Sequence, residues 1–219
     1  LSETGIQDYS IFLLVQLKNM FTGIIETTGV ITHIANNGTN VTFTVASSIS
    51  NELKVDQSVA HSGICLTVEQ VTDSKHTITA IQETLQKTNA GKWKVNDVLN
   101  IERCLLANSR IDGHFVQGHV DATATCIEKK DEGGSWIFSF EFEEKFAPLM
   151  IEKGSVSING TSLTCFNVGR TRFSVAIIPY TYTHTNIQFV QVNDTVNIEF
   201  DVFGKYMNRF YELMQPTNA

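Results

Sequence analysis

One segment that combines serine, threonine and glycine occurs twice in the 219-residue chain, and its residue types suit ligand binding. Ser58-Val-Ala-His-Ser-Gly-Ile-Cys-Leu-Thr67 recurs 97 residues later as Ser155-Val-Ser-Ile-Asn-Gly-Thr-Ser-Leu-Thr164. Hydroxyl groups beside a strand, together with a glycine that exposes the backbone, can hydrogen-bond a flat polar heterocycle. The sequence therefore predicts two related small-molecule sites.

The repetition extends well beyond this segment. Ile81-Gln-Glu-Thr84 recurs as Ile178-Pro-Tyr-Thr181, and Val95-Asn-Asp-Val-Leu-Asn-Ile-Glu102 recurs as Val192-Asn-Asp-Thr-Val-Asn-Ile-Glu199, both again 97 residues later. A period of this length indicates a duplicated domain, because solenoid repeats are much shorter. For the element ending in Glu102 and Glu199 we expect only a turn and a strand that fold a barrel.

Short strands are the elements that must position these groups. Alternating runs such as Val41–Val45 and Phe173–Ile177 have one buried face, and the turn signals Asn37-Gly38, Ser62-Gly63, Gly133-Gly134 and Asn159-Gly160 separate such runs. About six short strands in under 100 residues indicate a closed barrel, which leaves no strand edge exposed. The fold class is therefore all-β, with two tandem barrels at 20–113 and 114–203.

A C-terminal helix and an N-terminal leader complete this organisation. Tyr206, Met207, Phe210, Tyr211 and Met214 recur at helical spacing, so the sequence predicts an amphipathic helix within 204–219 that packs on another subunit or on its own barrel. Residues 1–19 precede the first well-patterned segment, and we interpret them as a leader outside the fold.

Composition excludes several classes of function. A net charge of −7 argues against a broad nucleic-acid surface, which needs an excess of lysine and arginine. The apolar run at 11–17 is too short to span a membrane and lacks the flanks of a signal peptide. Four cysteines without a C-x-x-C pair indicate neither zinc nor a disulfide scaffold, so a cytoplasmic protein without metal is expected.

Five motifs in register resemble the riboflavin synthase family, alpha-chain type. They are Met20-Phe-Thr-Gly-Ile-Ile-Glu26, Ser58–Val68, Gly113-His-Phe-Val-Gln-Gly-His-Val-Asp121, Gly160-Thr-Ser-Leu-Thr164 and Ile178-Pro-Tyr-Thr181. The resemblance implies two six-stranded Greek-key barrels, a C-terminal helix that assembles a homotrimer, and possible association with lumazine synthase. It also implies dismutation of two 6,7-dimethyl-8-ribityllumazine molecules to riboflavin and 5-amino-6-(D-ribitylamino)uracil, without cofactor or metal.

The resemblance further implies a substrate pocket in each half. The first pocket would contain Phe21, Gly23, Ile24, Ile25, Cys65, Leu66, Thr67, Thr79, Ala80, Ile81, Gln82, Glu83, Thr84, Gly118, His119 and Val120. The second would contain Lys153, Ser162, Leu163, Thr164, Ile178, Pro179, Tyr180, Thr181, Tyr182 and Thr183. The implied catalytic candidates are His119, Ser58, Cys65, Ser162, Asp201 and His114, with His119 the first choice for general acid–base chemistry.

Alternatives stay open at the level of sequence. Cys65 is also suited to a plain core position, and His61 and His76 are expected at the surface or in turns. Ser62, Tyr180 and Asp112 depart from the family pattern, which keeps a non-enzymatic lumazine- or flavin-binding protein as the second hypothesis. A flavin-dependent oxidoreductase is a remote third, because no G-x-G-x-x-G motif is present.

Overall fold

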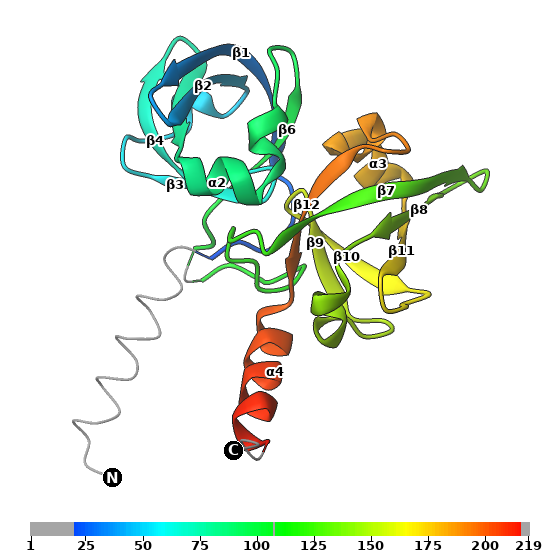
Figure 1. Cartoon of the computed structure of the whole chain (residues 1–219). Coiled ribbons are helices and arrows are strands. Elements are labelled where there is room, and N and C mark those ends of the chain that lie inside the picture. The colour runs from blue at the N-terminus through cyan, green and yellow to red at the C-terminus, as the bar shows by residue number, and fades with distance from the viewer. Residues whose placement is uncertain (1–19, 107, 216–219) are drawn as a thin grey trace.

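The computed structural model describes residues 20–106 and 108–215, so the predicted leader lies outside the described residues. These residues form two closed six-stranded antiparallel barrels and a C-terminal helix (Figure 1), which confirms the predicted fold class. The first barrel contains β1 (Thr27–Asn37), β2 (Asn40–Ser47), β3 (Ser58–His61), β4 (Ile64–Thr72), β5 (Lys75–Ala80) and β6 (Val98–Arg103). The second contains β7 (Ala122–Asp131), β8 (Trp136–Glu141), β9 (Ser155–Ile158), β10 (Thr161–Phe166), β11 (Arg172–Ile177) and β12 (Thr195–Phe200).

Both barrels have the same strand order. The first runs β1-β2-β5-β4-β3-β6, and the second follows the same path from β7 to β12. In each, the second strand pairs with the fifth instead of the third, which gives the Greek-key connection. The two halves that repeat in sequence therefore have the same strand topology.

The helices also come in equivalent places. α2 (Gln82–Lys87) and η2 (Asn89–Lys92) precede β6, while α3 (Pro179–His184) and η4 (Asn186–Phe189) precede β12. Two further short helices, η1 (Ser50–Glu52) and η3 (Glu144–Leu149), lie between the second and third strands of each barrel. The last element, α4 (Val202–Met214), begins where the Asp201 carboxylate accepts the Phe203 N–H at 2.9 Å.

The two barrels meet at equivalent two-residue hairpins. Ser62-Gly63 and Asn159-Gly160 both have positive φ at each residue, as a type I′ turn requires. A Cβ atom on Gly63 would lie 2.6 Å from the Gly160 nitrogen, so only glycine allows this approach.

Buried asparagines hold this contact together. The side chain of Asn100 donates to the Asn159 carbonyl at 2.9 Å, and that of Asn197 donates to the Ser62 carbonyl at 2.9 Å. Both asparagines belong to the repeated Asn-Ile-Glu segments that we expected only to fold a barrel. They also join the barrels, so that expectation was too narrow.

The expectation that His61 and His76 lie at the surface or in turns is wrong, because both are buried strand residues. Their exposed fractions are 0% and 1%, and their Nε2 atoms are 2.8 Å apart inside the first barrel. His61 Nδ1 lies 3.1 Å from the Val59 carbonyl, and His76 Nδ1 lies 2.9 Å from the Ser50 hydroxyl. These partners satisfy all four ring nitrogens, which is why two histidines can replace apolar side chains here.

Candidate active site

Two extended segments carry eight of the candidate site residues, and each contacts the opposite barrel. The segment 20–26 precedes β1, and the segment 114–121 precedes β7. The Gly23 carbonyl accepts the N–H of Ser162 in the second barrel at 2.8 Å, and the Gly118 carbonyl accepts the N–H of Cys65 in the first at 2.9 Å. Each segment therefore lies against the strand that carries the candidate nucleophile of the opposite barrel.

Glycine is required at both crossing points. Gly23 and Gly118 have φ of +75° and +74°. A Cβ atom at either one would lie 2.6 Å from the Cβ of Ser162 or Cys65, respectively. The close approach of the segments to the two strands depends on the absence of a side chain.

Around Ser162 the structure brings together two more catalytic candidates. His114 Nδ1 lies 2.7 Å from Ser162 Oγ, and the charge of Asp201 acts on the same imidazole. Burial lowers the pKa of His114, and the Asp201 charge opposes this change. His114 Nε2 is buried and has no hydrogen-bond partner among the described residues, so one nitrogen of this imidazole is left unpaired.

Around Cys65 the structure gathers a different set of groups. The Ser58 side chain opposes the rise in the pKa of Cys65, and the Cys104 thiol donates to the Ser58 carbonyl at 3.3 Å. Burial raises the pKa of the Cys65 thiol and raises that of Cys104 to about 11. Both sulfurs are therefore thiols at neutral pH, without the activation that a nucleophilic thiolate needs.

His119 occupies the place in its segment that Ile24 has in the other. Its backbone N–H donates to the Glu199 carboxylate at 3.0 Å, while its side chain is exposed. Within one chain the two candidate histidines are therefore in different settings, with His114 buried and His119 exposed. The two halves of the duplicated fold therefore differ in the surroundings of their candidate histidines.

The remaining candidates lie along equivalent elements of the two barrels. They are placed on β4 (Leu66, Thr67), β5 (Thr79, Ala80), α2 and its cap (Ile81, Gln82, Glu83, Thr84), the loop before β9 (Lys153), β10 (Leu163, Thr164), and α3 and its cap (Ile178, Pro179, Tyr180, Thr181, Tyr182, Thr183). The Leu66, Ala80 and Phe21 side chains are buried in hydrophobic clusters of the core. Ile81, Ile178 and Tyr180 are more than half exposed, at 53%, 59% and 69%.

A cavity of about 500 Å³ opens beside the first segment. Ile24 and Ile25 from the candidate pocket line it, together with Cys104, Glu102 and Arg110. Its volume lies in the range of small-molecule sites. This cavity therefore brings two residues of the predicted first pocket together with Cys104, while Cys65 and Ser58 do not line it.

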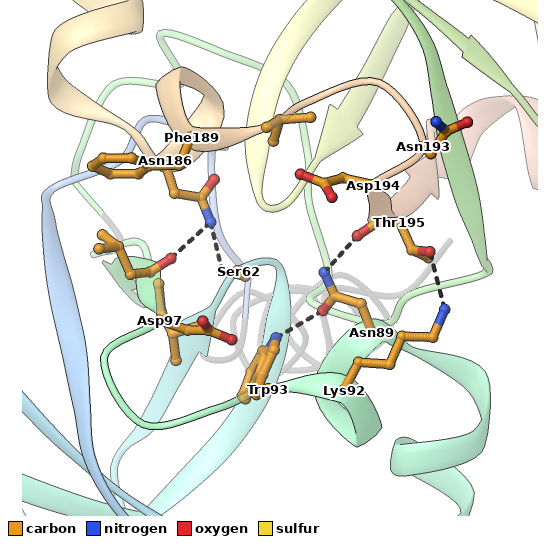
Figure 2. A pocket seen from close by; sticks show the side chains of 13 residues that line it. Ser62, Asn89, Lys92, Trp93, Asp97, Asn186, Phe189, Asn193, Asp194 and Thr195 are labelled. Carbon is orange, nitrogen blue, oxygen red and sulfur yellow. Dashed lines mark hydrogen bonds between the residues drawn. The ribbon is translucent and has the colours of Figure 1, made fainter.

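The cavity between the barrels is a different feature (Figure 2). It measures about 430 Å³, and most of its polar side chains pair with other protein groups. Asn89 accepts from Trp93 at 3.0 Å, Lys92 donates to Thr195 at 3.0 Å, and Asn186 donates to Ser62 at 3.1 Å. We regard it as a junction that holds the barrels together.

Comparison with known proteins identifies the family. The Lumazine binding domain family matches residues 22–104 and 117–201, one copy in each half. Riboflavin synthase of Bacillus amyloliquefaciens is 36% identical over 203 residues, which cover 91% of this chain and 94% of that protein. Riboflavin synthase of Schizosaccharomyces pombe is 36% identical over 197 residues, which cover 88% of this chain and 94% of that protein. The chain belongs to the riboflavin synthase family.

Solved structures show the same fold for this family member. LumP complexed with 6,7-dimethyl-8-(1'-D-ribityl) lumazine matches 82% of the chain with a TM-score of 0.75 at 17% identity. LumP complexed with riboflavin matches the same share with a TM-score of 0.77. At this identity the likeness establishes the duplicated-barrel architecture.

Two buried carboxylates of this family member were missed at the level of sequence. Glu102 Oε1 accepts the Thr22 N–H at 2.7 Å and the Thr22 hydroxyl at 2.8 Å, and Oε2 accepts the Gly23 N–H at 3.0 Å. Glu199 accepts the N–H groups of Gln117 at 2.7 Å and His119 at 3.0 Å, one on each oxygen. Burial raises the pKa of each carboxyl to about 7, against the opposing effect of these N–H donors.

The structure also gives two findings on membranes and metals. No helix in 20–106 or 108–215 is long and apolar enough to cross a membrane. Over the same residues, no three histidine, cysteine, aspartate or glutamate side chains are grouped as metal ligands.

Proposed function

We propose that the protein is a riboflavin synthase. It converts two molecules of 6,7-dimethyl-8-ribityllumazine into riboflavin and 5-amino-6-(D-ribitylamino)uracil by moving a four-carbon unit from one to the other. The observation that carries the proposal is identity of 30–36% to proteins named Riboflavin synthase, over most of the length of both chains. Two lumazine-binding repeats in one chain support it.

The duplication has a chemical reason under this proposal. A reaction between two copies of one substrate needs two similar sites that hold the reacting rings face to face. Holding reactants in near-attack geometry can contribute about 7–11 kcal/mol to lowering the barrier. The two halves share one fold but differ at equivalent positions, where Cys65 corresponds to Ser162 and Ile24 corresponds to His119. The two sites can therefore bind the donor and the acceptor lumazine differently.

His114 is the group that we assign to proton transfer in the second site. The reaction requires a base that removes a proton from the C7 methyl of one lumazine and a nucleophile or water that adds at C7 of the other. The neutral His114 imidazole with its unpartnered Nε2 suits the first task, with Ser162 and Asp201 orienting it. The Cys65 thiol and the exposed His119 are assigned to the first site, as a hydrogen-bond donor and an acid–base group.

We further propose a homotrimer in which the first barrel of one chain faces the second barrel of its neighbour. The exposed aromatic side chains of α4 support an assembly role for this helix, since Tyr206 and Phe210 are 72% and 60% exposed. All four cysteines are free thiols, which supports a cytoplasmic location. Association with lumazine synthase, which would supply the substrate, is part of the same proposal.

Incubation of the purified chain with 6,7-dimethyl-8-ribityllumazine tests the activity. We expect riboflavin fluorescence to appear, with one riboflavin formed for each two lumazines consumed. Tight lumazine binding without turnover would instead favour the non-enzymatic binding protein. Added metal chelator should leave the rate unchanged, because no step of the proposed reaction uses a metal.

A further inference from the structure

The two buried carboxylates Glu102 and Glu199 hold equivalent places at the ends of β6 and β12. Only 6% and 2% of their surfaces are exposed. Each accepts backbone N–H groups from an extended segment, Glu102 from 22–23 and Glu199 from 117–119. Burying a carboxylate destabilises a fold unless donors such as these N–H groups compensate the lost hydration. A glutamate at the equivalent buried position of both barrels therefore suggests a function for the two residues.

The effect of each carboxylate reaches the other barrel. Glu102, in the first barrel, holds Thr22 and Gly23, and the Gly23 carbonyl accepts the N–H of Ser162 in the second. Glu199, in the second barrel, holds Gln117 and His119, and the Gly118 carbonyl between them accepts the N–H of Cys65 in the first. The duplication thus gives two equivalent chains of hydrogen bonds. One leads from Glu102 in the first barrel to Ser162 in the second, and the other leads from Glu199 in the second barrel to Cys65 in the first.

We propose that Glu102 and Glu199 are positioning residues that act on the opposite barrel. Each one sets the geometry of the candidate site that the other barrel carries. Glu199 fixes the backbone of His119 and the Gly118 carbonyl over Cys65. Glu102 fixes the Gly23 carbonyl over Ser162, the partner of His114. The assignment of catalytic roles to those sites rests on the proposed function, whereas the positioning itself does not.

Substitution at Glu199 can separate positioning from charge. A glutamine keeps the shape of Glu199, but its amide NH₂ would face one of the two N–H donors, so one bond is lost. An aspartate keeps the negative charge and withdraws the oxygens by one methylene. The distinction matters because the Glu199 charge itself raises the pKa of Cys65. Removing that charge would speed alkylation of the Cys65 thiol even if the segment 117–119 did not move.

Alkylation of Cys65 by iodoacetamide, located by peptide mass, is the test on the full-length chain. We expect Glu199→Asp and Glu199→Gln to raise its rate by about tenfold, because a segment with a lost buried bond opens more often. Glu102→Gln and the exposed control Glu143→Gln should leave that rate at the wild-type value. Rates at the buried Cys126 and Cys165 report any general loosening.

Turnover provides the reciprocal readout. Both Glu102→Gln and Glu199→Gln should lower kcat/KM by at least about tenfold, and Glu143→Gln should not. Acceleration at Cys65 in Glu199→Gln but not in Glu199→Asp would overturn the proposal in favour of electrostatics alone. Equal acceleration at all four cysteines, or at Cys65 in Glu102→Gln, would also overturn it. A wild-type chain without turnover would contradict the proposed function and leave the alkylation result intact.

Discussion

His114 is the described residue in which a buried polar atom lacks a partner, and the first prediction concerns it. Replacement by glutamine keeps a polar side chain of similar size but removes the group that can take up a proton. We expect His114→Gln to lower kcat by about 100-fold, the usual contribution of a general base, with a smaller change in KM. Riboflavin fluorescence measures both. The exposed His33→Gln is the matched control, and a wild-type kcat in His114→Gln would contradict the assignment.

The buried pair His61 and His76 predicts acid sensitivity of the first barrel. Burial lowers their pKa values to about 3 and about 4, and the proximity of His76 adds to the effect on His61. The unfolded chain binds protons near pH 6.5 and the folded chain does not, so each histidine lowers stability as pH falls below 6.5. The slope is about 1.4 kcal/mol per pH unit for each residue until the folded pKa is reached.

The second barrel supplies the matched variant for this prediction. Ile158 and Phe173 stand 97 residues after His61 and His76, so His61→Ile with His76→Phe introduces the apolar pair that the fold already accepts. Urea unfolding at pH 7 and pH 5 should show a larger loss of stability for the wild type than for the double variant. Glu102 and Glu199 act in the opposite direction in both proteins, so the difference isolates the histidines. Equal losses would contradict the prediction.

The internal repeat indicates whether a position is buried more reliably than the type of a single residue does. His61 and His76 were expected at the surface or in turns because they have no counterpart in the chemistry of the family, although their equivalents Ile158 and Phe173 are apolar and indicate two core positions. Comparison of the two halves position by position would have corrected the error. By contrast, Glu102 and Thr22 are 80 residues apart in sequence, and no local pattern predicts that hydrogen bond.

At the scale of elements, local patterns located four of the twelve strands and the turns between several of them. Alternation places β2, β5, β8 and β11, and the Asn-Gly and Ser-Gly pairs supply the positive φ of the tight hairpins. The extended segments at 20–26 and 114–121 have no such periodicity. Their positions depend on buried carboxylates and on contact with the opposite barrel. Sequence reasoning found their residues through the repeat of Gly23–Thr28 as Gly118–Thr123 and through the family resemblance, and neither predicts these contacts.

The helix α4 carries the prediction that belongs to this scale. Apart from its first turn it extends away from both barrels (Figure 1), and Tyr206, Met207, Phe210 and Tyr211 are each at least 60% exposed. A chain ending at Phe203 should therefore be monomeric, retain folded barrels by near-ultraviolet circular dichroism, and have little activity. A chain ending at Gln215 is the control and should stay trimeric. Sedimentation analysis decides, and a trimer in the shorter chain would contradict the role given to α4.

At the scale of the whole molecule, the question is whether one chain or two form a complete reaction site. A complete reaction site combines one first barrel with one second barrel. Cys65 belongs to the first barrel and Ser162 to the second, so Cys65→Ala impairs only the first-barrel half of a site and Ser162→Ala only the second-barrel half. If the first barrel of one subunit works with the second barrel of its neighbour, a mixed trimer contains some sites with both halves intact. Random mixing in a closed ring makes about one site in four complete.

The final prediction is recovery of activity on mixing. Each variant alone should have well under about a tenth of wild-type activity, because removal of a group that contacts the reacting molecule typically costs that much. Unfolding and refolding the two variants together at equal amounts should restore about a quarter of wild-type kcat. Refolding them separately before mixing is the control and should restore none. If joint refolding also restores none while trimers form, the two barrels of a single chain constitute the site, and the duplication acts within the chain instead of across subunits.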